Sequence, residues 1–534
     1  MKLFATIIAL AGVFAASAQA HQETNISKWQ FSQTGAEWKA VTVPHDWAIS
    51  GPFDKKWDLQ VVAIKENGED KPTEHSGRSG SLPWIGKGFY KTTVHIAEGT
   101  AYAELKFDGA MADPEVSVNG KKAGHWAYGY NAFRVDITPY IHTGDYLIEV
   151  VLENEEESNR WYPGGGIYRP VTLITHATKS RLDLWGLQMQ TLSIDGGRAL
   201  IDIRHEGKDI PADAMLKVTV TDKGGKVVAN ASSPADGMGG FHTQVSIADP
   251  QLWSPETPYL YDVKLSLVAD GKTLDVQHQK LGVRTVKFSA EGGFQLNGVT
   301  RKIKGVCLHH DLGPLGAAEN KAALIRQIKM MKQMGCDAIR TAHNMPSTMQ
   351  MELCDSLGMM VMAESFDMWI YPKCKNGYAK FFKEWSDKDI TNLVKHHRNH
   401  PSIIMWSIGN EIPEQWSKEG VQIAKRLQDI CHQYDPSRPV TQGMDKAEDA
   451  LKSGFAQVMD VPGFNYRVHK YYKNIEQLPQ GFLLGSETAS TVSSRGVYKF
   501  PVVVSDKATY PDGQCSSYDT EYLSLIHISE PTRL

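Results

Sequence analysis

Cysteine is scarce in this sequence and absent from its first 306 residues. The 534 residues contain six cysteines, which excludes the small secreted domains that depend on dense disulfide bonding. A chain of this length buries a core large enough to fold without such links, and at about 150 residues per domain we expect three or four domains. The sequence leaves the disulfide status of the six cysteines open.

The sequence also lacks an excess of charge of one sign, and beyond residue 20 it lacks long apolar runs. The sequence has 57 Lys+Arg and 61 Asp+Glu, a net charge of -4, and so it has no excess of basic residues for nucleic acid or an anionic membrane. Beyond residue 20, no stretch is apolar for long enough to predict a transmembrane helix. We therefore expect neither nucleic-acid binding nor membrane insertion.

The one long apolar run lies near the N-terminus, at residues 3–16. Lys2 precedes it and Ala18-Gln19-Ala20 follows it, which is the pattern of a secretory signal peptide; a buried core helix is the alternative. We expect a signal peptide at residues 1–20, a mature chain from His21, and a periplasmic or secreted protein. No cysteine lies near the cleavage site to carry a lipid anchor.

The last twelve residues, 523–534, read LSLIHISEPTRL. They resemble the in-frame translation of a transposase sequencing adaptor, and an ordinary polar tail is the alternative. We exclude them from the fold, as an engineered scar would be excluded. The expectation that follows is that the natural protein continues beyond Tyr522 and that this chain is a fragment.

Two consecutive segments have the alternating pattern of β-strands. In residues 21–178 apolar side chains alternate with polar ones, as at Ile148 and Val150, and Asn119-Gly120 predicts a hairpin turn. Residues 179–288 repeat this style around Val218 and Leu265. The first segment is expected to form a jelly-roll-like β-sandwich and the second an immunoglobulin-like β-sandwich.

From residue 289 to 522, short apolar runs alternate with helical patterns. Helices are predicted after Asn320 and Ser417, which are good N-caps. Seven strands are predicted at 303–308, 338–341, 359–363, 403–408, 439–441, 462–466 and 482–485. Alternating strands and helices imply parallel βα units, and seven strands without a dinucleotide-binding glycine motif predict a (β/α)8 TIM barrel. We expect the eighth strand to lie beyond Tyr522, so this barrel is incomplete.

Polar residues follow each predicted barrel strand, and the carboxyl ends of barrel strands converge on one face. Two of these residues, Glu411 and Glu487, follow long apolar runs on the fourth and seventh strands. Glycoside hydrolysis needs two such carboxylates, whereas either one alone is more simply explained as a salt-bridged barrel residue. The other candidate binding residues at these ends are His309, His310, Arg340, His343, Asn344, Asp367, Trp369, Asn410 and Tyr466.

The chain resembles glycoside hydrolase family 2 over nearly all of residues 21–522. The motifs that carry the resemblance occur in family order: PHDW, GFYKTTV and NRWYPGGGIYRPV, followed by GVCLHHDLG, IRTAHNMPS, ESFDMW and SIGNE. The resemblance implies a retaining exo-β-glycosidase in which Glu411 is the acid/base and Glu487 the nucleophile. It also implies that the first sandwich is a sugar-binding domain and that Arg340, Asn410 and the other residues above bind the sugar; for Trp369, packing beneath the loop is the alternative.

The resemblance favours a terminal β-D-galactoside as substrate. The alternative enzyme is a β-glucuronidase of the same family. The alternative that is not an enzyme is a non-catalytic carbohydrate-binding protein. We expect a β-linked galactoside oligosaccharide or glycan as the partner and no cofactor, and the sequence leaves homo-oligomer formation open. Some relatives bind Mg²⁺ beside the acid/base, but the loop from Glu364 to Trp369 lacks the additional ligands, so we expect no required metal.

The absence of these ligands predicts that the hydrolytic rate survives removal of metal. At 25 °C, the native-length protein should hydrolyse a β-galactoside at an unchanged rate after treatment with EDTA, because no ion assists proton transfer at Glu411. A large loss of rate that Mg²⁺ restores would show that the loop between Glu364 and Trp369 does hold a metal.

Overall fold

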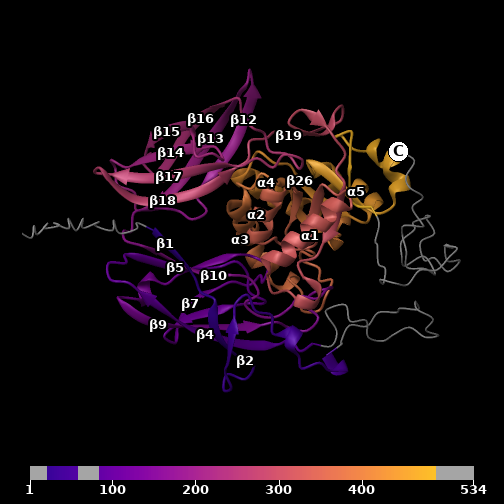
Figure 1. Cartoon of the computed structure of the whole chain (residues 1–534). Helices are drawn as coiled ribbons and strands as arrows, with labels where there is room; N and C mark the ends of the chain where they lie inside the picture. The colour runs from indigo at the N-terminus through magenta and orange to yellow at the C-terminus, as the bar shows by residue number, and fades with distance from the viewer. Residues whose placement is uncertain (1–20, 58–82, 489–534) are drawn as a thin grey trace, which may run out of the picture.

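The structure is a computed structural model that describes residues 21–57 and 83–488. The expected signal peptide, adaptor-like tail and eighth barrel strand lie outside these residues. Figure 1 shows two layered β-structures, one from the N-terminal third of the chain and one from the following hundred residues, both beside a body of helices and strands. In the described part of the chain, no helix is long and apolar enough to cross a membrane.

The first β-structure is a sandwich of two antiparallel sheets. One sheet contains, in spatial order, β3 (Lys39–Thr42), β2 (Lys28–Ser32), β4 (Lys87–Ile96), β9 (Gly144–Glu153), β6 (Glu115–Val118) and β7 (Lys121–His125). The other contains β1 (His21–Asn25), β10 (Val171–His176), β5 (Tyr102–Phe107) and β8 (Phe133–Asp136). Alternate side chains, among them Leu105 and Val150, fill one core between the sheets, as the period of two requires.

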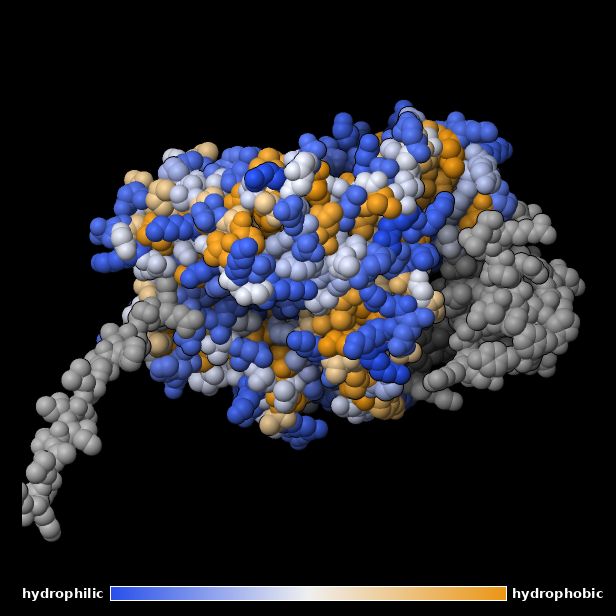
Figure 2. Space-filling view, turned by 45° about the horizontal axis from the view of Figure 1, so that its top comes forward, coloured by the Kyte–Doolittle hydropathy of each residue, from blue (hydrophilic) through white to orange (hydrophobic). Residues whose placement is uncertain are grey.

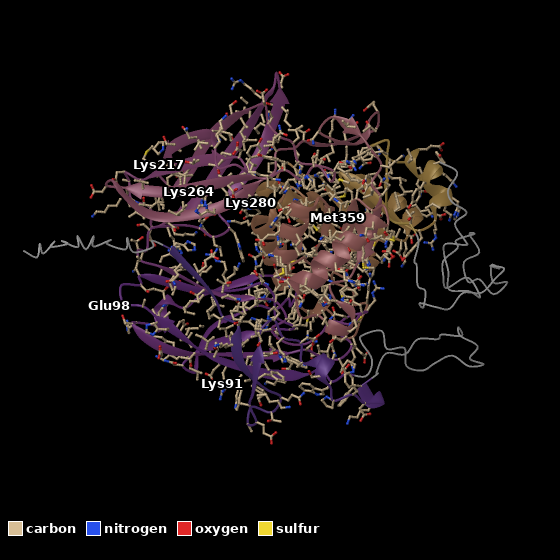
Figure 3. All side chains as sticks on the ribbon, viewed as in Figure 1. Lys91, Glu98, Lys217, Lys264, Lys280 and Met359 are labelled. Carbon is tan, nitrogen blue, oxygen red and sulfur yellow. The ribbon has the colours of Figure 1, made fainter. Side chains whose placement is uncertain are left out.

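The second β-structure is also a sandwich of antiparallel sheets. One sheet contains β11 (Arg181–Leu182), β13 (Arg198–Lys208), β12 (Gln188–Asp195) and β16 (Gly240–Ala248), and the other contains β15 (Val227–Pro234), β14 (Met215–Thr221), β17 (Tyr261–Ala269) and β18 (Lys272–Leu281). Leu216 and Leu265 belong to the core between them. Lys217 and Lys264 are exposed on the opposite face of their strands (Figure 3).

A small sheet of β19 (Val286–Ser289), β20 (Gly293–Leu296) and β21 (Val299–Thr300) leads into the barrel. The barrel strands are parallel and lie in chain order: β22 (Gly305–Leu308), β23 (Ala338–Thr341), β24 (Met360–Glu364), β25 (Ile403–Asn410), β26 (Val440–Met444), β27 (Val461–Asn465) and β28 (Leu484–Glu487). The thiol of Cys307 lies 3.7 Å from the carbonyl oxygen of Ser486, so the first and last strands approach each other. The predicted barrel architecture is confirmed.

Helices connect the barrel strands. They are α1 (Lys321–Gln333), α2 (Thr348–Leu357), α3 (Ala379–His397), α4 (Lys418–Tyr434), α5 (Ala447–Ser453), α6 (Phe455–Val458) and α7 (Tyr471–Ile475). Asn320 and Ser417 cap α1 and α4 as predicted, each accepting a hydrogen bond from a backbone N–H in the first turn. The buried face of α1 carries Leu324, Ile328 and Met331, which follow the spacing of one helix face.

Arg169 joins the first sandwich to the barrel. Its buried guanidinium donates hydrogen bonds to the carbonyl of Tyr130 at 2.8 Å and that of Met345 at 2.9 Å, with longer contacts to the carbonyls of Asp108 and Pro346. Nearby, the barrel's Asp389 accepts hydrogen bonds from Trp126 and Asn131 of the sandwich. These buried polar contacts fix the sandwich against the barrel. The outer surface mixes hydrophilic and hydrophobic residues (Figure 2), as ordinary protein surfaces do.

This junction predicts that Arg169→Lys destabilises the protein by about 2–3 kcal/mol, because an ammonium lacks the rigid fork whose two terminal nitrogens reach the carbonyls of Tyr130 and Met345 separately. Thermal or chemical unfolding measures the effect. Arg204→Lys is the matched control, since the Arg204 side chain is 61% exposed. Equal melting temperatures for Arg169→Lys and the wild type would contradict this role of the guanidinium.

Candidate active site

The carboxyl ends of the barrel strands bring Glu411 and Glu487 together. Glu411 directly follows β25, and Glu487 is the last residue of β28. The side-chain nitrogen of Asn465, at the end of β27, lies 3.0 Å from Glu411 Oε1 and 3.4 Å from Glu487 Oε2. The two carboxylates predicted from the sequence therefore share one amide group.

Arg340 forms the centre of a buried polar network. From β23 its Nη1 donates to Glu487 Oε2 at 2.9 Å, and its Nε and Nη2 donate to the two oxygens of Glu364 at 2.8 and 3.0 Å. Its Nη2 also donates to Asn410 Oδ1 at 2.8 Å. One guanidinium thus holds two carboxylates and one amide in fixed relative positions.

Glu364 is fully buried, and its neighbours keep it charged. Burial raises the pKa of Glu364, but the charge of Arg340 and the hydrogen bonds from His343 and Ser407 outweigh it, so the pKa lies below its ordinary value. Glu364 closes β24, where the sequence predicts a strand end, yet only the structure reveals that it positions Arg340. It acts as a positioning residue because it contacts the arginine that holds Glu487.

Tyr466 reaches Glu487 from the adjacent strand end. Its hydroxyl donates a hydrogen bond to Glu487 Oε1, and its backbone N–H donates to the carbonyl oxygen of Glu487. Tyr466 and Glu411 both have left-handed backbones, with φ of 57° and 46°. Residues other than glycine adopt this conformation at a cost, and such strain is concentrated at functional sites.

The environment of Glu411 favours a protonated carboxyl group. Burial and then the negative charge of Asp445 raise the pKa of Glu411 above its ordinary value, while the ammonium of Lys373 opposes this shift. Glu487, in contrast, receives hydrogen bonds from a guanidinium and a phenol. The two carboxylates are therefore placed in different electrostatic environments within one site.

Asp367 forms ion pairs with two cationic side chains, those of Arg160 and Lys373. Its oxygens accept two hydrogen bonds from Arg160 at 2.7 and 2.8 Å and one each from Lys373 and Asn410. Burial raises the pKa of Asp367, but Lys373 and Arg160 outweigh it and hold the pKa far below its ordinary value. Arg160 belongs to the first sandwich, so Asp367 links that sandwich to Asn410.

The remaining candidates fall in different places. His343 Nδ1 donates a hydrogen bond to Glu364 Oε1 at 2.7 Å. His309 lies against His343 and the indole of Trp161, with ring centroids 5.6 and 4.9 Å away. His310 contacts the carbonyl of Pro163. The structure brings His309 and His343 beside the carboxylate network and places His310 against the first sandwich.

Trp369 and Asn344 are buried. Trp369 is 0% exposed, donates to the carbonyl of Ile408 and packs against Phe382 and Phe455. This corrects the expectation that Trp369 offers a sugar an open apolar face and favours packing beneath the loop. Asn344 is 2% exposed and donates to the carbonyl of Ala342 at 3.3 Å.

Sequence reasoning passed over several residues of the site. Asn465 ends a predicted strand and could have been chosen on that ground. Arg160 and Trp161 lie in the NRWYPGGGIYRPV motif, but nothing in their spacing indicates that they reach across to the barrel. Among residues 21–57 and 83–488, the one group of three side chains that could ligate a metal is His21, His176 and Asp275, which lies in the two sandwiches.

Comparison with known proteins agrees with this geometry. The family model "Glycosyl hydrolases family 2, TIM barrel domain" matches residues 289–520, and "Glycosyl hydrolases family 2" matches residues 187–284. A β-galactosidase of Bacteroides ovatus is 34% identical over 511 residues, covering 87% of this chain and 58% of the relative. A β-glucuronidase of Bacteroides fragilis is 31% identical over 451 residues, covering 78% of this chain and 60% of that protein.

Solved structures give the same relationship. A family 2 glycosyl hydrolase of Bacteroides cellulosilyticus has a TM-score of 0.79 and 32% identity, covering 88% of this chain and 61% of that one. A β-glycosidase of Bacteroides vulgatus has a TM-score of 0.74 and 32% identity, with 86% and 58% coverage. The chain thus spans about three fifths of the length of these relatives. With the barrel, the paired glutamates and both family models in agreement, the chain belongs to glycoside hydrolase family 2.

Proposed function

We propose that the native-length protein is a retaining exo-β-glycosidase that hydrolyses terminal, non-reducing β-D-galactosides. The observation that carries the proposal is the pair Glu411 and Glu487, whose carboxylates contact the same nitrogen of Asn465. Oxygens at these distances from one atom lie at most about 6.4 Å apart, which accommodates the about 5–5.5 Å between the carboxyl groups of retaining glycosidases. A separation in that range supports direct attack by one carboxylate on the sugar.

Glu487 is the proposed nucleophile. Its carboxylate attacks the anomeric carbon, the glycosidic C–O bond breaks, and a covalent glycosyl-enzyme forms. The hydrogen bonds from Arg340 and Tyr466 orient the carboxylate of Glu487. As the ester bond forms, Glu487 loses its negative charge, and Arg340 remains paired with Glu364.

Glu411 is the proposed acid and base. In the first step it donates its proton to the leaving oxygen, and its raised pKa favours the protonated form that this step needs. In the second step its carboxylate removes a proton from water as that water attacks the anomeric carbon and releases Glu487. Asn410, held between Arg340 and Asp367, is placed beside Glu411 to bind the sugar 2-hydroxyl, a contact that strengthens in the transition state.

The choice of sugar rests on the relatives. The β-galactosidase of Bacteroides ovatus supports a galactoside, and the β-glucuronidase of Bacteroides fragilis supports a glucuronide as the second candidate. Comparing kcat/KM for aryl β-galactoside and aryl β-glucuronide decides between them. A non-catalytic binding protein would show saturable sugar binding without turnover, and the raised pKa of Glu411 beside an intact Glu487 supports catalysis instead. An exported, periplasmic or secreted location remains part of this proposal.

The assigned roles predict different effects of two isosteric substitutions. Glu487→Gln removes the nucleophile and should lower the rate by more than about 1000-fold for every substrate. Glu411→Gln removes the acid and should lower it by about 100- to 10,000-fold for poor leaving groups and much less for good ones. Rates with aryl galactosides of graded leaving-group pKa, and NMR of the first anomer released, provide the measurement. Net inversion, or a wild-type rate in Glu487→Gln, contradicts the proposal.

The environment of Glu411 also predicts a shift in pH dependence. Because Glu411 must be protonated to act as an acid, kcat/KM falls as pH rises through its pKa. Asp445→Asn removes a negative charge that raises this pKa, so the alkaline limb of the pH profile should move to lower pH. Asp429→Asn, an exposed change on α4, is the control and should leave the limb unchanged. An unchanged limb in Asp445→Asn, or a shift to higher pH, would refute the assigned cause.

A further inference from the structure

Two histidines and one aspartate meet where the two sandwiches touch. His21 in β1 and His176 in β10 lie directly opposite each other in an antiparallel pair, and Asp275 projects from β18 of the second sandwich. Figure 1 shows β1 on the side of the first sandwich that faces β18. The three side chains offer ligand atoms that lie within 4.8 Å of one another.

The distances among these atoms suit a small divalent ion. His21 Nδ1 lies 3.2 Å from Asp275 Oδ1, and His176 Nδ1 lies 3.7 Å from the same oxygen. Ligands about 2.0–2.2 Å from a tetrahedral Zn²⁺ are separated by roughly 3.3–3.6 Å. These two separations bracket this range, and the ligand atoms of His21 and His176 lie within 4.8 Å of each other, so side-chain rotations can bring all three atoms to bonding distance.

Neighbouring groups fix the orientation of the ligands. His21 Nε2 lies 3.2 Å from Glu23 Oε1, and the second oxygen of Asp275 accepts a hydrogen bond from the backbone N–H of Leu182 at 2.9 Å. A metal-bound histidine generally donates its other ring N–H to a carboxylate or carbonyl, which sets its tautomer. His21 with Glu23 has this arrangement, with Nδ1 turned toward the other two ligands.

His176 supplies an independent indication of a ligand. It is 4% exposed, and its Nδ1 has no hydrogen-bond partner. Buried polar atoms are rarely left unsatisfied. A buried imidazole nitrogen without a hydrogen-bond partner can present its lone pair to a metal ion.

A proton is the competing explanation for the cluster. A protonated His21 would donate to both Asp275 and Glu23, whose oxygens each lie 3.2 Å from one of its ring nitrogens. Protonation of His21 nevertheless leaves His176 Nδ1 without a partner. A metal ion satisfies His21, His176 and Asp275 together, while the positive charges of Arg134 and Arg181 nearby oppose it and limit its affinity.

We propose that His21, His176 and Asp275 bind one divalent transition-metal ion of the Zn²⁺ class, with Glu23 as the outer carboxylate that orients His21. Two imidazoles and one carboxylate form a common donor set for zinc. Because β1 and β10 belong to one sandwich and β18 to the other, the ion fastens the two sandwiches to each other. Its role is structural, and it lies outside the network around Glu411 and Glu487.

Zinc titration of the untagged, native-length protein tests this site. After EDTA treatment and desalting, a chelator competition should show that the wild type binds one Zn²⁺ and that His176→Gln binds it much more weakly. Zn²⁺ should raise the melting temperature of the wild type but not that of His176→Gln. Glu23→Gln should weaken binding by about 10- to 100-fold. The matched control is His95→Gln, which removes an exposed histidine paired with Asp145 in the same sandwich and should bind zinc as the wild type does.

The outcomes separate this site from the catalytic proposal. Zinc bound equally by His176→Gln and the wild type overturns the site, as does a wild type that retains no zinc at micromolar free concentration. Each variant's rate of aryl galactoside hydrolysis at 25 °C should remain that of the wild type, with or without zinc. A rate lost together with zinc in the wild type overturns the structural role assigned to the ion.

Discussion

The site depends on the ion pairing of one buried guanidinium. Arg340 is 4% exposed and Glu364 is 0% exposed, and burying either charge without its partner would be strongly unfavourable. Pairing them through two hydrogen bonds fixes the plane of the guanidinium, which leaves Nη1 aimed at Glu487 and Nη2 shared with Asn410. The position of the proposed nucleophile therefore follows from the pairing of Arg340 with a carboxylate that takes no part in bond making.

The same pairing explains how two glutamates in one site come to have different surroundings. Arg340 donates a hydrogen bond to Glu487, whereas burial and the negative charge of Asp445 both raise the pKa of Glu411. One carboxylate thus lies against a guanidinium and the other lies where its acid form is favoured, which suits the division of roles in two-carboxylate hydrolysis. The left-handed backbone of Glu411 turns its side chain out of the strand direction toward Asn465.

Much of this arrangement could be predicted from the sequence, because strand ends are marked by local patterns. Apolar runs and caps located the barrel strands and α1, and parallel strands bring their carboxyl ends together whatever the side chains do. Side-chain direction is not encoded in that pattern. Trp369 therefore looked like a sugar platform although it points into the core, and Glu364 and Asn465 were passed over because their importance lies in partners distant in sequence. To select Arg160 and Trp161 as site residues, one would have to know how the first sandwich docks on the barrel.

Because the first sandwich docks on the barrel, residues of both domains form the site. Arg160 of the sandwich bonds Asp367, Asp367 bonds Asn410, Asn410 accepts from Arg340, and Arg340 bonds Glu487. Each link is charged or amide-bearing and nearly buried, so displacement of one member leaves its neighbours unsatisfied and costs about 1–3 kcal/mol per group. A barrel without its sandwich would keep both glutamates but lose the outer end of this chain. The sandwich is thus part of the catalytic geometry, and the contacts of Arg169 that fix it against the barrel help to hold Asn410 where the sugar hydroxyl is proposed to bind.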